Sequence, residues 1–122
     1  MTRQEQIAAV LERLASGIGS DMTGAVAVSS DGLVLASRIA SDVNADRVGA
    51  VAATMIGVTR RVATELKIGQ TEEAILRADN GLFMVLPAGT QSLLAVAVRQ
   101  GANLGMVRIE AREAAAAIAA FL

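Results

Sequence analysis

The chain has 122 residues, which is the length of a single domain. It contains no cysteine and no histidine, which excludes disulfides, thiolate or imidazole metal sites, and catalysis by either side chain. The 11 basic and 12 acidic residues give a net charge of −1 and aromatic residues are only 2%, which argues against a nucleic-acid partner. Mean hydropathy is +0.50, and 25 residues are alanine. Because a short chain this apolar covers itself poorly as a monomer, we expect it to associate with another chain.

The sequence indicates neither a secretory signal nor a membrane span. Residues 1–6 are polar, and no long apolar run follows them. The longest uncharged stretch, residues 80–98, has a turn-forming segment at 87–92 in its middle. Two short strands joined by a loop fit this stretch better than a spanning helix, so we expect a cytoplasmic protein without membrane insertion.

The first elements are a helix and a hairpin. Thr2 and Glu5 have the spacing of a capping box, and apolar residues at helical spacing then predict a helix over about 3–16, ended by Gly17 and Gly19. Strands are predicted over 22–29 and 33–39, because Asp31-Gly32 between them favours a tight turn. In the second strand, strict alternation would place Val34 on the same side as Ala36 and Arg38.

A long helix is predicted over about 44–66, after several candidate capping residues at 42–46. We expect its main apolar stripe to face the core, namely Val48, Val51, Ala52, Met55, Val58, Thr59, Val62 and Leu66. Three strands follow at 71–78, 82–86 and 93–98, the last two as continuous apolar runs typical of strands covered on both faces. Asn103 is placed to cap a last helix over about 104–121. The predicted order is αββαβββα, as one domain over residues 1–122 with a mainly antiparallel sheet.

The long helix has a second face built from small residues and arginines. On a face exposed to water, Lys, Glu and Gln would be usual, and each glycine in a helix interior costs about 1 kcal/mol relative to alanine. Small residues spaced four apart allow another backbone to approach closely, as in membrane helix pairs. The face packs either against this chain's own helices or against a second copy or partner, and the arginines belong either to that contact or to a solvated helix end. We expect a dimer or partner surface made of Gly49, Ala50, Ala53, Ile56, Gly57, Arg60, Arg61 and Thr64.

Three segments together resemble one known family. They are the hairpin at 24–37, the long helix rich in small residues after Asp46, and the segment Gly101–Arg108 that leads into the last helix. Each motif is weak alone, but their order and spacing are similar to the Roadblock/dynein light chain superfamily over nearly all of the chain.

The resemblance implies a fold and a function. The fold is a profilin-like α/β sandwich, with a five-stranded antiparallel sheet, the long helix on one face and the two terminal helices on the other. Two copies pair edge to edge with their long helices side by side. Bacterial members of the family sit beside small Ras-like GTPases, and the gliding-motility member is a dimer that binds its GTPase and stimulates GTP hydrolysis. Other members are scaffolds in dynein and in lysosomal signalling complexes. We therefore expect a homodimeric regulator of a small Ras-like GTPase, with a sensor-kinase complex as a further candidate partner.

The regulator is expected to act by rearranging the loops of its GTPase. Arg38, Arg60 and Arg61 are available as arginine fingers, but the resemblance argues against one. The main alternative is a scaffold that assembles a signalling complex without changing GTP hydrolysis.

Two further interpretations carry little weight. Catalysis by carboxylates would need Glu72 and Glu73, which point to opposite faces of a strand, or Asp42 and Asp46, which bracket a helix start. Nucleotide binding at residues 101–105 lacks a Walker lysine, because the one lysine is Lys67. We expect no catalytic residue, cofactor or metal in this chain.

Overall fold

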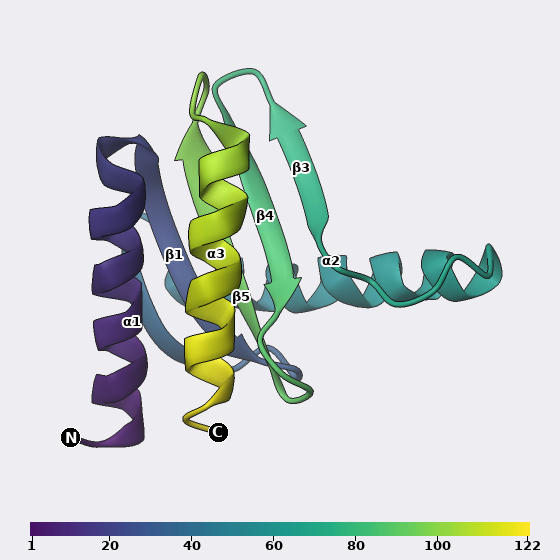
Figure 1. The fold of residues 1–122 in the computed structure, drawn as a ribbon, viewed down its shortest axis with the longest axis horizontal. Coiled ribbons are helices and arrows are strands. Elements are labelled where there is room, and N and C mark those ends of the chain that lie inside the picture. The colour runs from purple at the N-terminus through teal and green to yellow at the C-terminus, as the bar shows by residue number, and fades with distance from the viewer.

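A computed structural model describes all residues 1–122 as five strands and three α-helices (Figure 1). The strands form one antiparallel sheet in the order β2-β1-β5-β4-β3. Their bounds are β1 Met22–Ser29, β2 Val34–Ile39, β3 Ala74–Ala78, β4 Gly81–Pro87 and β5 Ser92–Arg99. The predicted αββαβββα order is confirmed, and β3 begins three residues later than expected.

The helices cover the two faces of the sheet unequally. Helices α1 (Arg3–Ile18) and α3 (Leu104–Ala119) lie side by side on one face, and α2 (Ala45–Glu65) crosses the other (Figure 1). A short 3₁₀ turn, Gly19–Asp21, connects α1 to β1. This is the α/β sandwich expected from the sequence. None of the helices has the length and apolar character needed to cross a membrane.

Side chains satisfy free backbone donors at the start of each helix. Thr2 and Glu5 form the reciprocal capping box of α1. The side chain of Asn44 accepts a hydrogen bond from the N–H of Arg47 at the start of α2. Asn103 does the same for α3, as predicted.

The core has two parts, one on each side of the sheet. The larger part lies under α1 and α3 and includes Ile7, Leu11, Met84, Leu94, Val107 and Ile118. The smaller part lies under α2 and consists of Ala52, Ile56, Ala74, Val85, Leu93 and Ala95. Successive residues of β4 and β5 thus enter opposite cores, which confirms that these apolar strands are covered on both faces.

The predicted alternation of β2 is wrong at its start. Ala36 pairs with Ala27, but Val28 then pairs with Val34, so Leu35 is the extra residue of a β-bulge. Leu35 packs against the core under α1 and α3, whereas Val34 faces α2. The bulge therefore turns the side chain of Val34 toward α2 at the edge of the sheet.

Candidate functional site

The side of α2 that faces the sheet is made mainly of small residues. Gly49, Ala52, Ile56 and Ala63 are the buried residues of this helix. A Cβ atom on Gly49 would lie 3.0 Å from Cγ2 of Val34, so glycine allows the helix to approach β2 closely. Two residues expected on the partner surface, Gly49 and Ile56, are therefore inside this chain.

The expected orientation of the apolar stripe is wrong by part of a turn. Val51, Val58, Val62 and Leu66 were expected to face the core but are 60%, 58%, 49% and 63% exposed, respectively. The stripe is wide, and the sheet covers only the edge that carries Ala52 and half-buried Met55. The periodicity locates the apolar side of a helix, but it does not show which part of that side its own sheet covers. We call Val51, Val58, Val62 and Leu66 the valine ridge.

The remaining predicted surface residues form a second outward face of α2. Ala50, Gly57, Arg60, Arg61 and Thr64 are exposed, and Ala53 is half-buried beside the turn at Gly32. A Cβ atom on Gly57 would meet no atom within 4 Å. At 3.6 residues per turn, this face lies roughly 140° around the helix from the valine ridge. We call Ala50, Gly57, Arg60, Arg61 and Thr64 the small–basic face.

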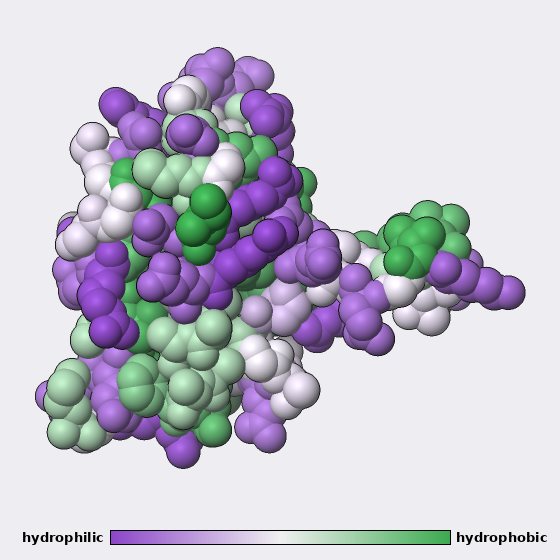
Figure 2. Space-filling model, in the orientation of Figure 1, coloured by the Kyte–Doolittle hydropathy of each residue, from purple (hydrophilic) through white to green (hydrophobic).

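Helix α2 extends beyond β3, the last strand of the sheet (Figure 1). Its far end carries exposed apolar side chains. Leu66 and Ile68 are 63% and 70% exposed there, and Figure 2 shows hydrophobic residues gathered on this projecting end. The end is fixed by a Schellman motif, in which the N–H of Ile68 donates to the carbonyl of Ala63 and that of Lys67 to Thr64. Lys67 adopts the left-handed conformation, with a φ of 55°. The tip is thus an ordered apolar projection.

The same face of the sheet has apolar side chains that α2 covers only in part. Phe83 packs partly against the core under α2, and its cross-strand neighbours Leu76 and Ala97 share its face. These three line a hollow of about 460 Å³ at the outer end of the sheet, and Leu76 is 50% exposed. We call this region the sheet hollow.

A second apolar groove lies between the projecting half of α2 and the segment at residues 68–73. Its volume is about 670 Å³, and Val58, Val62 and Ile68 line it. Thr71 also lines it and has a buried hydroxyl oxygen with no hydrogen-bond partner. The groove joins the valine ridge to the tip, so the apolar surface continues along one side of the helix.

Of the carboxylates considered for catalysis, Glu73 and Asp46 have structural roles. Glu73 accepts hydrogen bonds from Nε of Arg108 at 2.9 and 3.1 Å, and this pairing raises the pKa of the Arg108 guanidinium. Asp46 lies in the first turn of α2, where a negative charge is favourable. Nowhere do three His, Cys, Asp or Glu side chains gather in a way that suits a metal ion.

The arginines considered as fingers differ in their surroundings. Arg38 is paired with Glu12 of α1 at 3.0 Å, which holds it on the far side of the sheet from α2. Arg60 and Arg61 take part in none of the four ion pairs and point outward from α2. Arg60 and Arg61 therefore leave two unpaired guanidinium groups on the small–basic face.

Solved structures share this architecture over nearly the whole chain. The gliding protein MglB of Thermus thermophilus superposes with a TM-score of 0.86 at 23% identity, covering 99% of this chain and 91% of that one. MglB of Myxococcus xanthus gives 0.88 at 15% identity, with 98% and 90% coverage. Profilin II of Acanthamoeba castellanii gives 0.58 at 15% identity, with 92% and 95% coverage, which confirms the profilin-like sandwich.

Sequence comparison leads to one family. An uncharacterized protein of Methanocaldococcus jannaschii is 35% identical over 97 residues, which are 80% of this chain and 84% of that protein. A second protein of that organism is 35% identical over 92 residues, 75% of this chain and 80% of its own length. The model of the Roadblock/LC7 domain matches residues 10–97. The chain is a member of the Roadblock/LC7 domain family.

Proposed function

We propose that this protein is a homodimeric cytoplasmic regulator of a small Ras-like GTPase, which it binds and whose GTP hydrolysis it modulates. The observation that carries the proposal is that α2 has two separate outward faces. One is the apolar valine ridge and the other is the small–basic face. A helix with two such faces is suited to contact two different surfaces at once.

The valine ridge supports self-association. An exposed apolar ridge that continues into a projecting tip is costly in water and is typical of a protein interface. The sheet hollow on the same side of this chain provides a complementary apolar surface, in which Leu76 is exposed and Phe83 is half-buried. A second copy placed beyond β3 would receive the tip in its own hollow and return the contact, as a two-fold interface requires. The MglB structure described as having a tetrameric arrangement is a precedent for self-association in this fold.

The small–basic face supports the contact with the GTPase. Gly57 permits close approach of another backbone, and Arg60 and Arg61 add positive charge without an acidic partner in this chain. A GTPase needs its attacking water positioned and the developing phosphate charge stabilised. We propose that contact with this face rearranges the loops of the GTPase, and that neither arginine enters its active site.

Two measurements test the proposal. Sedimentation equilibrium of the purified chain at micromolar concentration is expected to give twice the 12.5 kDa monomer mass. Single-turnover GTP hydrolysis by a Ras-like GTPase of the same organism is expected to accelerate when this protein is added at saturation. A monomer in the first experiment, or no acceleration despite binding in the second, would refute the corresponding half of the proposal.

A scaffold is the second candidate, favoured by the same two-faced helix. A homodimer with two free small–basic faces would bring two partner molecules together without altering either, for example around a sensor kinase. Binding of the GTPase with an unchanged hydrolysis rate would support the scaffold. A third case is an arginine finger, in which Arg60 or Arg61 enters the active site of the GTPase. Replacing both arginines by lysine tests it, because this variant would then bind the GTPase with unchanged affinity but no longer accelerate GTP hydrolysis.

A further inference from the structure

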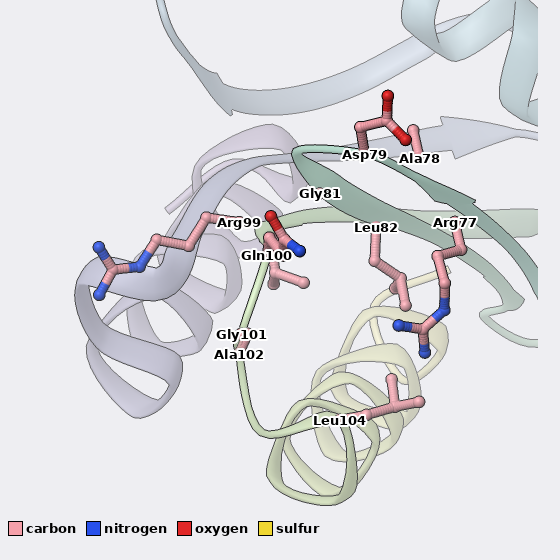
Figure 3. A pocket seen from close by; sticks show the side chains of 11 residues that line it. Arg77, Ala78, Asp79, Gly81, Leu82, Arg99, Gln100, Gly101, Ala102 and Leu104 are labelled. Carbon is pink, nitrogen blue, oxygen red and sulfur yellow. The ribbon is translucent and has the colours of Figure 1, made fainter.

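A second recess lies on the opposite side of the sheet from α2, between edge strand β3 and helix α3. Glu73, just before β3, reaches Arg108 of α3, which shows which side of this segment faces the helix. Because side chains alternate along a strand, Ile75 and Arg77 face the same way. Figure 3 shows Arg77 and Leu82 pointing toward Leu104 at the start of α3. Arg77, Leu82 and Leu104 line a cavity of about 380 Å³, together with Asp79 and Arg99. We call this cavity and the adjoining surface between Ile75 and Arg108 the β3–α3 groove.

The groove has more positive than negative charge. Arg108 and Arg112 share one carboxylate, that of Glu73, at 2.9 and 3.4 Å. Arg77 takes part in none of the ion pairs, and Figure 3 shows the carboxylate of neighbouring Asp79 on the other side of the strand. Arg99, which also lines the cavity, is paired with Asp21. Arg77, Arg108 and Arg112 thus outnumber the carboxylates of Glu73 and Asp79, which leaves an excess of positive charge along the groove.

Apolar side chains lie between these cations. Leu82 and Leu104 are half-buried at the floor, and Ile75 is 36% exposed on one wall. Ile109 is 67% exposed on the outer side of α3, three residues before Arg112 and therefore beside it. Gly105, four residues before Ile109, adds no side chain to this surface of α3. The groove therefore combines separated positive charges with an apolar floor.

We propose that the β3–α3 groove binds an acidic, partly apolar segment of a partner protein. The carboxylates of such a segment would pair with Arg77 and with Arg108 or Arg112, and an apolar side chain would lie against Leu82 and Leu104. Charge complementarity selects an acidic occupant, since the groove lacks the carboxylates to neutralise its own cations. Because the recess lies between one strand and one helix, we expect a single extended segment to enter it and a flat lipid bilayer not to. The site is independent of both faces of α2.

The experiment uses two fluorescein-labelled 12-residue peptides, one alternating Glu and Leu and one with Gln in place of every Glu. Fluorescence polarisation with the full-length protein is expected to show binding of the Glu peptide at low salt, weakening as salt rises. The Gln peptide is expected to bind at least about tenfold more weakly. Amide chemical-shift changes on addition of the Glu peptide are expected at residues 75–77, 82 and 104–109, and not on α2.

Matched variants locate the site. Arg77→Gln is expected to weaken binding of the Glu peptide by up to about fivefold, and Ile109→Ser is expected to weaken it to a smaller extent. Arg61→Gln removes the same charge from the small–basic face and is expected to leave binding unchanged. Equal affinity for the two peptides, or equal effects of Arg77→Gln and Arg61→Gln, would overturn the proposal. So would binding to vesicles containing anionic phosphatidylserine without binding of the Glu peptide. Arg77→Gln is expected to leave dimerisation and GTP hydrolysis unchanged. The groove proposal and the proposed GTPase regulation can therefore be refuted independently of each other.

Discussion

Gly49 of α2 lies against Val34 of β2 so closely that a Cβ atom at position 49 would be 3.0 Å from Cγ2 of the valine. This contact brings the helix close to the sheet on one side and leaves the valine ridge uncovered on the other. The rotation of α2 is thus set by a glycine and a bulge, neither of which contributes to an apolar stripe.

The two glycines of α2 are expected to respond oppositely to a larger side chain. Gly49→Val would force atoms into Val34 and Val28, and is expected to lower the unfolding free energy by roughly 1–3 kcal/mol. Gly57→Ala meets open space and improves helix propensity, so it is expected to raise that free energy by roughly 0.5–1 kcal/mol. Urea denaturation at one fixed protein concentration measures both. Equal effects of the two substitutions would mean that the described rotation of α2 is incorrect.

Val62 is expected to be essential for self-association and unimportant for the fold of one copy. Val62→Arg places a charge on the valine ridge, which would be buried without a partner in the proposed dimer. Sedimentation is expected to give a folded monomer, with a circular dichroism spectrum like that of the parent. Ile56→Ala is the contrasting variant, because this side chain is 2% exposed under α2 and its truncation is expected to cost about 2–5 kcal/mol.

Gly57→Arg tests the other face. The substitution adds a long charged side chain where the GTPase is proposed to approach, so affinity for the GTPase is expected to fall at least about tenfold. The dimer is expected to persist, because the valine ridge is unchanged. A variant that stays dimeric and still binds the GTPase with parental affinity would exclude the small–basic face as the partner surface.

The end of α2 offers a stabilising substitution. Lys67 has a φ of 55°, a conformation that costs a residue with a Cβ atom about 1–2 kcal/mol and costs glycine little. Part of this gain is lost to the greater freedom of glycine in the unfolded chain, so Lys67→Gly is expected to add roughly 0.5–1 kcal/mol. Thermal unfolding measures the gain. Lys67→Ala is the control, since it removes the same charge but keeps the strained conformation.

Stability is expected to fall in acid through two carboxylates that accept local hydrogen bonds. The backbone N–H of Thr2 holds the pKa of Glu5 below its ordinary value of 4.5, and the hydroxyl of Ser29 does the same for Asp31, whose ordinary value is 3.8. A lowered folded-state pKa gives stability that is present above the unfolded-state pKa and is lost as the pH falls through the folded-state pKa. Unfolding midpoints measured from pH 6 downward are expected to decline below about pH 4.5. Glu5→Gln is expected to make this decline shallower, and an unchanged slope would contradict the assignment.

Local signals in the sequence account for most of the fold. The capping box at Thr2, the Asp31-Gly32 turn and the cap at Asn103 each act within a few residues, so they can be recognised without tertiary contacts. The bulge at Leu35 has no such signal, because it depends on how β2 pairs with β1. Strict alternation therefore placed Val34 on the wrong side.

The candidate surface was only partly predictable for the same reason. Periodicity correctly showed that α2 has more apolar and small residues than one face needs. It did not show that the sheet covers only one edge of the stripe, so Val51, Val58, Val62 and Leu66 are left uncovered. Gly49 and Ile56 were consequently assigned outward. The β3–α3 groove was missed altogether, since Arg77 and Arg108 are 31 positions apart in sequence and only the tertiary fold places them on the same side of the sheet.

The apolar tip of α2 has a consequence for how the chain behaves on dilution. If its apolar residues are covered only by a second copy, each tenfold fall in concentration removes about 1.4 kcal/mol of association free energy per dimer. Newly made chains below the dissociation threshold would expose Leu66 and Ile68 to chaperones and proteases. In the cell, unpaired copies would then be degraded quickly, whereas paired copies would be retained.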